Sequence, residues 1–176
     1  MKSLIKYLNE KLIINQRFDE KLIINKNYKS PYTCAPKSFD ELRKIIEDRY
    51  DKLGPGTKDM PIDFNDIDVS NINSFCNKNN TGIFERTKFE YIDISDWNVS
   101  NAEYMNYMFS YCYHLKSVGD LSNWNVSNVE YMNDMFKECV LLESVGDLSN
   151  WDVSKVIYMN NTFKESGIIN IPKWYK

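Results

Sequence analysis

Histidine is almost absent from this chain, which holds a single one, His114, among its 176 residues. A Ser-His-Asp or Cys-His catalytic arrangement would therefore depend on that one side chain. The sequence also lacks the glycine-rich phosphate-binding patterns G-x-x-x-x-G-K-[ST] and G-x-G-x-x-G. We assign no catalytic residue, and the sequence predicts a protein that is not an enzyme and needs no cofactor.

Cysteine is also sparse, and its spacing is not that of a metal site. The four cysteines form no C-x-x-C pair and no Cys/His cluster of the kind that binds zinc, so no metal ligand is assigned. Cys112 and Cys139 lie at one position of a repeat, where thiols pack as small hydrophobic groups. Unpaired thiols favour a reducing compartment, which predicts a cytoplasmic or virion-associated protein.

Long hydrophobic runs are missing as well. The segment Met1–Glu10 lacks the apolar run of about 7–15 residues that a signal peptide needs. No stretch is long enough to span a bilayer. The net charge of -3 gives no electrostatic argument for nucleic acid or an anionic membrane. The predicted partner is therefore another protein, without nucleic acid and without a membrane span.

The chain does contain a repeat. Residues Trp97–Ser100 recur as Trp124–Ser127 and, with Asp replacing Asn, as Trp151–Ser154, and successive copies are 27 residues apart. Two weaker copies flank these: one has Ile67 in the tryptophan position, 30 residues before Trp97, and the other ends at Trp174. A fixed period of this size indicates stacked repeats, which usually present a surface and seldom build a catalytic pocket.

Each copy carries large apolar residues at fixed positions, and these are predicted to form the repeat core. Exposed tryptophans would instead form a carbohydrate platform, and the sequence leaves this alternative open. Within a copy, Leu115 and Val118 indicate a strand, and the spacing from Ala102 to Cys112 indicates a helical face. The core positions are Trp97, Trp124, Trp151, Met105, Met132, Met159, Phe109, Phe136 and Phe163.

The repeated pattern resembles a known family. Residues 120–142 match D-L-S-x-W-x-V-S-x-V-x-x-M-x-x-M-F-x-x-C-x-x-L nearly throughout, and this unit resembles the BspA-like leucine-rich repeats of bacterial surface proteins, which also occur in phage genomes. The resemblance covers residues 60–176 and implies an α/β fold, a short solenoid of about four strand-turn-helix repeats. It implies binding or adhesion and not catalysis. Surface members carry export signals, which this chain lacks.

Three segments follow from these patterns: an N-terminal arm (1–35), a capping helix with its turn (36–59) and the repeats with a C-terminal cap (60–176). A capping box at Ser38 and Glu41 begins the helix, and Gly54 ends it. The arm repeats Glu-Lys-Leu-Ile-Ile-Asn, and it either covers the repeat stack or docks on a partner or larger assembly. Its apolar residues are Leu4, Ile5, Leu8, Leu12, Ile13, Ile14, Leu22, Ile23 and Ile24.

The predicted function is protein–protein interaction through the solenoid surface. Tyrosine is enriched in interfaces, so a tyrosine-rich region with one histidine is the candidate partner surface, and extra packing around a longer loop is the alternative. These residues are Tyr104, Tyr107, Tyr111, Tyr113, His114, Tyr131 and Tyr158. Two other functions stay open: a structural or packaged component of a phage-like assembly anchored by the arm, or an adhesin-type surface protein.

One aspartate also recurs in each copy. Such a column of like charges needs compensation, which turn capping or calcium would supply. The column comprises Asp63, Asp93, Asp120 and Asp147.

Overall fold

The structure is a computed structural model, and it describes residues 32–176. In chain order it contains the helix α2 (Phe39–Leu53), the strands β1 (Ile62–Asp63) and β2 (Ile92–Asp93), and the 3-10 helix η1 (Leu148–Asn150). The apolar residues assigned to the arm, from Leu4 to Ile24, lie outside the described part. Within residues 32–176, no helix has the length and apolar character that a membrane span requires.

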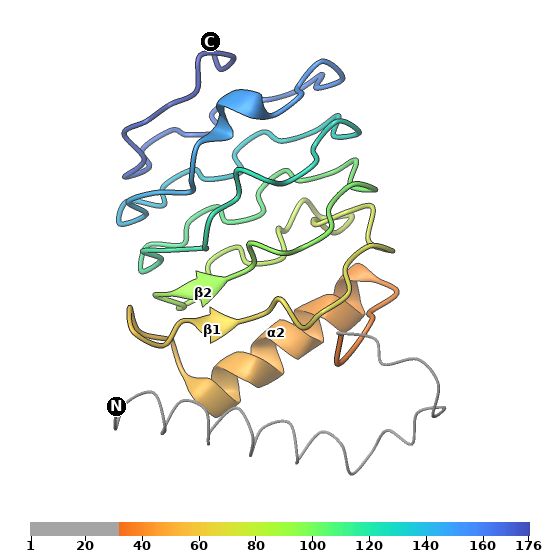
Figure 1. The fold of residues 1–176 in the computed structure, drawn as a ribbon, viewed down its shortest axis with the longest axis vertical. Coiled ribbons are helices and arrows are strands. Elements are labelled where there is room, and N and C mark those ends of the chain that lie inside the picture. The colour runs from red at the N-terminus through yellow and green to blue at the C-terminus, as the bar shows by residue number, and fades with distance from the viewer. Residues whose placement is uncertain (1–31) are drawn as a thin grey trace.

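Helix α2 lies at one end of the molecule, beside β1 (Figure 1). The side chain of Ser38 accepts a hydrogen bond from the Glu41 amide at its start, and the Gly54 amide donates to the Tyr50 carbonyl at its end. Gly54 adopts a φ of 75°, a conformation that glycine enters without a steric penalty. Leu42 and Ile46 are buried against the rest of the chain. The helix thus covers the apolar interior of the first repeat.

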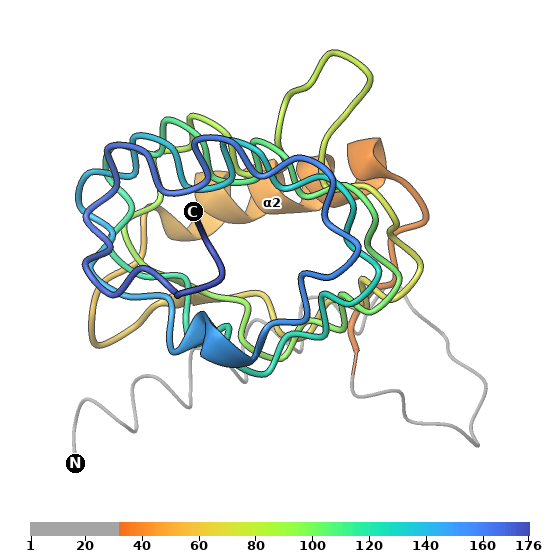
Figure 2. The same ribbon diagram turned by 90° about the horizontal axis from the view of Figure 1, so that it is seen from above.

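After α2 the chain winds into stacked coils (Figures 1 and 2), and its buried apolar side chains form one cluster. β1 pairs with β2 in parallel, with Ile62 opposite Ile92. Single parallel bridges continue the stacking, from Tyr91 to Ser117 to Ser144 on one side and from Ser74 through Tyr104 and Tyr131 to Tyr158 on another. Each coil is therefore in register with the next, one repeat later in the sequence.

The predicted α/β solenoid of strand-turn-helix repeats is wrong. In the described part α2 is the single α-helix, it precedes the repeats, and the two strands have two residues each. Where the helix was expected, Tyr107 and Tyr111 adopt φ values of 61° and 60°, which interrupt a right-handed helix. The Tyr107 amide donates to the Asn133 carbonyl in the next coil, not to a residue four positions earlier. The segment is a run of turns bonded between coils.

Aromatic rings stack through the interior. The rings of Phe84, Phe109, Phe136 and Phe163 follow one another with centroid separations of 5.3, 5.3 and 5.7 Å. Offset stacking at this separation is favourable in addition to the burial of apolar area. Of the expected core positions, Met159 is half-buried and the others are buried.

Candidate functional site

Three tyrosines form a stacked ladder on the outside of the coils. The ring centroids of Tyr104 and Tyr131 are 4.9 Å apart, and those of Tyr131 and Tyr158 are 5.5 Å apart, with interplanar angles of 11° and 20°. Parallel bridges at the same three residues fix the backbone beneath the rings. Tyr104 and Tyr131 are half-buried, and Tyr158 is 50% exposed. We call these three residues the tyrosine ladder.

A hollow of about 500 Å³ lies beside the ladder. One wall is a loop at residues 77–81 that projects beyond the outline of the coils and is yellow-green in Figure 2. The Asn77 carboxamide oxygen accepts hydrogen bonds from the amides of Asn79 and Thr81 at 2.9 and 3.0 Å, which closes this loop. The hollow is lined by Ser74, Cys76, Asn77, Lys78, Asn80, Tyr104, Asn106, Tyr107, Tyr131 and Asn133.

The loop is fastened to the ladder side by buried polar contacts. The Cys76 thiol donates to the Asn106 side-chain oxygen at 3.2 Å, and the Ser74 hydroxyl donates to the Cys76 carbonyl at 2.6 Å. Burial raises the pKa of Cys76, so the thiol keeps the proton that it donates. Burial, followed by the nearby Asp134 charge, raises the pKa of Tyr107 on the same wall. Besides Lys78, the hollow therefore presents the protonated phenol of Tyr107 and the side-chain amides of its asparagines.

Three of the candidate residues lie apart from this hollow. The ring centroids of Tyr111 and Tyr113 are 6.1 Å apart, and the Tyr113 hydroxyl donates to Glu138 at 3.1 Å. The guanidinium of Arg86 and the ammonium of Lys137 lie over the Tyr111 ring at 5.1 and 5.2 Å. His114 is exposed, and it does not line the hollow. The candidate residues thus divide between the ladder with its hollow and a charged second patch.

The tryptophans bond each coil to the one before it. The indole N–H groups of Trp97, Trp124, Trp151 and Trp174 donate to the carbonyls of Phe64, Ile94, Leu121 and Leu148, at 2.9, 3.3, 3.0 and 2.7 Å. Trp97, Trp124 and Trp151 are buried, so these rings offer no exposed platform. They hold successive coils in register.

Comparison with known proteins places the repeats in one family. The model of a family described as a Mycoplasma protein of unknown function, DUF285, matches residues 56–174. The chain belongs to the DUF285 family. No curated protein and no solved structure matches it. The DUF285 region includes every coil, the ladder and the hollow, and begins after α2.

The recurring aspartates of the DUF285 region cap turns. The carboxylates of Asp63, Asp93, Asp120 and Asp147 each accept a hydrogen bond from the amide two residues later, at 2.9 to 3.0 Å. The hydrogen bonds from Ser122 lower the pKa of Asp120, and those from Ser149 lower the pKa of Asp147. Within residues 32–176, no three acidic, histidine or cysteine side chains gather as metal ligands do. Turn capping by these backbone amides thus offsets the repulsion between the recurring aspartate carboxylates.

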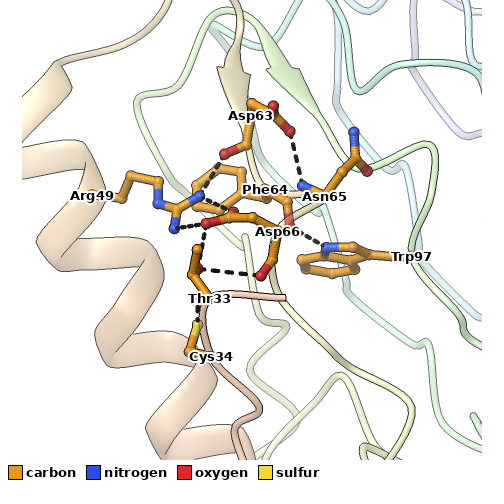
Figure 3. Close-up of polar contacts among 8 residues, drawn as sticks. All are labelled: Thr33, Cys34, Arg49, Asp63, Phe64, Asn65, Asp66 and Trp97. Carbon is orange, nitrogen blue, oxygen red and sulfur yellow. Dashed lines mark hydrogen bonds and ion pairs between the residues drawn. The ribbon is translucent and has the colours of Figure 1, made fainter. Parts of the chain in front are cut away.

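An ion pair joins α2 to the first DUF285 coil (Figure 3). The Arg49 guanidinium donates to both carboxylate oxygens of Asp66, at 2.6 and 3.2 Å, and also to the Asp63 carbonyl. Thr33 donates to the same carboxylate, and the guanidinium lies 5.0 Å from the centre of the Phe64 ring. Burial alone would raise the pKa of Asp66, but the hydrogen bonds and charge of Arg49 outweigh it and hold this pKa below its ordinary value of 3.8.

We expect this ion pair to stabilise the fold in a pH-dependent way. Because the pKa of Asp66 is lower in the folded chain than the ordinary value of 3.8, its contribution is present above pH 3.8 and is lost as the pH falls through the folded value. Asp66→Asn should lower the free energy of unfolding at pH 7 by about 1–3 kcal/mol, since Arg49 loses its partner.

Urea denaturation of both proteins at pH 7 and pH 3 measures this effect. The difference between wild type and Asp66→Asn should shrink at the lower pH. An equal difference at both values would contradict the assignment. Asp68→Asn, at a turn two residues away, is the matched control, because Arg49 makes no contact with it.

The sequence patterns named three tyrosines that line the hollow, Tyr104, Tyr107 and Tyr131, but did not name its polar wall. Asn77, Lys78 and Asn80 belong to no repeated column, so the alignment of copies does not point to them. The available signal was the interval of 30 residues between Ile67 and Trp97, whereas the next two intervals are 27. The additional length forms the projecting loop.

Proposed function

We propose that this protein is a non-enzymatic repeat protein that binds another protein through the tyrosine ladder and the adjoining hollow. The observation that carries the proposal is the ladder itself: three parallel rings on a backbone fixed by bridges between coils. Tyrosine supplies a large, rigid contact area with a polar tip and loses little side-chain entropy on binding. A surface that is already ordered loses less conformational entropy when it binds a partner.

The chemistry of the hollow supports a polypeptide ligand. Its carboxamides, from Asn77, Asn80, Asn106 and Asn133, both donate and accept hydrogen bonds, as peptide groups require. Burial, followed by the neighbouring Tyr131, raises the pKa of Tyr104, so its phenol remains a donor at neutral pH. The ladder would contact apolar side chains of the ligand, while the amides would pair with its backbone.

We further propose that the repeats are related in sequence to those of BspA-like proteins. The support is the unit at residues 120–142, which agrees with the BspA-like pattern nearly throughout. Binding and adhesion are the activities that this relationship suggests, and they agree with an aromatic ladder that is partly exposed.

Tyr131→Ala tests the proposal, because Tyr131 is the middle ring of the ladder. Wild type and variant, immobilised as full chains, would be incubated with a lysate of the source organism, and the retained proteins identified by mass spectrometry. A central interface tyrosine typically contributes about 2 kcal/mol or more, so we expect partner affinity to fall about thirtyfold or more. Proteins held by the wild type should be missing from Tyr131→Ala.

Tyr91→Ala is the matched control. Tyr91 is half-buried, stands beneath the Lys116 ammonium at 5.5 Å and lines a different hollow. This variant should retain the same proteins as the wild type, and thermal denaturation shows whether both variants remain folded. Retention of the same proteins by folded Tyr131→Ala, or of none by the wild type, would overturn the proposal.

A further inference from the structure

The backbone bonds between coils run in one direction along the phenylalanine side of the stack. The amide of Phe84 donates to the Met108 carbonyl, that of Phe109 to the Met135 carbonyl and that of Phe136 to the Thr162 carbonyl, at 2.9, 2.9 and 2.8 Å. Every bond in this row has its donor in the earlier coil. Within residues 32–176, the first coil of the row therefore has carbonyls that receive no amide from an earlier coil, and the last coil has N–H groups that reach no later carbonyl. An α-helix has the same asymmetry in the opposite order, with free N–H groups at its first turn.

Helix α2 supplies donors at the carbonyl end. The Arg43 guanidinium donates to the carbonyls of Ile83 and Gly82 at 2.7 and 3.3 Å. Ile83 occupies the place in its coil that Met108 and Met135 occupy in theirs, so Arg43 takes the position of an amide from a preceding coil. The positively charged guanidinium of Arg43 thus donates to carbonyls at the first coil of the row.

Among the residues that the structure describes, the opposite end has no such complement. In the coil before it, the amides of Met132, Asp134, Phe136 and Glu138 donate to carbonyls of the terminal coil. The corresponding amides one repeat later have no acceptor among residues 32–176; we call them the donor edge. They belong to Met159, Asn161, Phe163 and Glu165. Phe163 is covered by the rings of Trp174 and Tyr175, while the other three residues are half-buried or exposed.

The terminal segment that contains the donor edge carries exposed apolar and basic side chains. Ile157, Tyr158, Ile169 and Ile171 are exposed large hydrophobic residues, and Ile169 is 83% exposed. Residues 151–176 contain four lysines but only Asp152 and Glu165 as acidic side chains, whereas the chain as a whole has a net charge of -3. Positive charge and unpaired donors therefore coincide at one end of a protein that is acidic overall.

We propose that the donor edge is a docking site for an acidic polypeptide segment of another protein. Carboxylate oxygens of that segment accept hydrogen bonds from the amides of Met159, Asn161 and Glu165, and its apolar side chains pack on Ile157 and Ile169. A second copy does not fit, because two donor edges facing each other would oppose donors with donors and lysines with lysines. The site is separate from the tyrosine ladder's hollow and does not depend on the proposed function.

The test is a titration of the full ¹⁵N-labelled chain with a blocked ten-residue peptide of alternating Glu and Val. Peptides in which Gln or Lys replaces Glu serve as comparisons. We expect downfield shifts of the Asn161 and Glu165 amides with the Glu peptide, and affinity about tenfold or more above that for the Gln peptide. Equal affinity for the Glu and Gln peptides, or stronger binding of the Lys peptide, would overturn the proposal.

A pair of variants isolates the contribution of one amide. Met159→Pro removes both the side chain and the N–H, whereas Met159→Ala removes only the side chain. Proline is compatible here because Tyr158 lies in a parallel bridge, the extended conformation that precedes proline. Met159→Pro should bind the Glu peptide about fivefold or more weakly than Met159→Ala, and equal affinities would contradict the donor role. Tyr104→Ala removes the ladder ring at the other end from Tyr158, so this variant should bind the Glu peptide as the wild type does, which separates this result from that of the ladder.

Discussion

Phe109→Ala should lower the free energy of unfolding by about 3–5 kcal/mol, as for other fully buried phenylalanines. The Phe109 ring is fully buried and lies between those of Phe84 and Phe136, with both centroids 5.3 Å away. Its removal deletes two ring contacts and leaves a cavity that the coils on either side are too tightly bonded to fill. Because each coil is buried by its neighbours, the loss should affect unfolding of the whole stack.

Urea denaturation followed by tryptophan fluorescence measures the effect of Phe109→Ala. The tryptophans of three successive coils are buried, so their emission reports on the stack as a whole. Phe109→Leu keeps most of the volume and should cost less. Tyr113→Ala, at a residue 47% exposed, should change stability by no more than about 0.5 kcal/mol. A change of under about 1 kcal/mol for Phe109→Ala would contradict the role of the phenylalanine row.

Gly82→Ala is expected to have the second large effect, about 3 kcal/mol. A Cβ atom at Gly82 would stand 1.9 Å from the Tyr107 carbonyl oxygen, 2.3 Å from its carbonyl carbon and 2.8 Å from the Met108 Cα. All three are backbone atoms of the next coil, so no side-chain rotation can relieve the clash. The coils must separate at the base of the projecting loop.

Gly54→Ala is the control for Gly82→Ala. Gly54 has a φ of 75° and no atom within 4 Å of an added Cβ, so alanine there meets conformational strain without a clash. It should cost about 1 kcal/mol, clearly less than the change at Gly82. Thermal denaturation ranks the two variants. A Gly82→Ala protein as stable as the wild type would show that the two coils are less closely packed than the distances indicate.

The repeat period predicted which residues occupy equivalent positions in successive coils. Residues at one position of the repeat, such as Trp97, Trp124 and Trp151, do occupy one position in successive coils, because in-register stacking requires it. The Ser38–Glu41 pattern lies at the first turn of α2, because a capping box acts locally. Both inferences depended on interactions that are specified by nearby residues or by the repeat itself.

The backbone conformation within a coil was not predictable in the same way. Apolar residues from Ala102 to Cys112 are spaced as on a helix, but consecutive turns bury the same positions. A helix forms when each amide bonds within its own segment, and a run of turns forms when the amides bond to the next coil. The spacing of hydrophobic residues is the same in both cases, so it does not distinguish them. Tyr107 and Tyr111 adopt left-handed conformations, but glycine, the residue that usually marks such a conformation in a sequence, is absent from both positions. The hollow was missed because it needs both the ladder and the loop to be placed.

The one-way direction of the bonds along the phenylalanine side also bears on how such proteins diverge. Along that side, a duplicated unit of 27 residues inserted in the middle of the stack would meet carbonyls in one neighbouring coil and amides in the other, as the internal coils do. Neither Arg43 nor the final coil would need to change. Each duplication would extend the tyrosine ladder by one ring, so the length of the proposed recognition surface can evolve separately from its two ends.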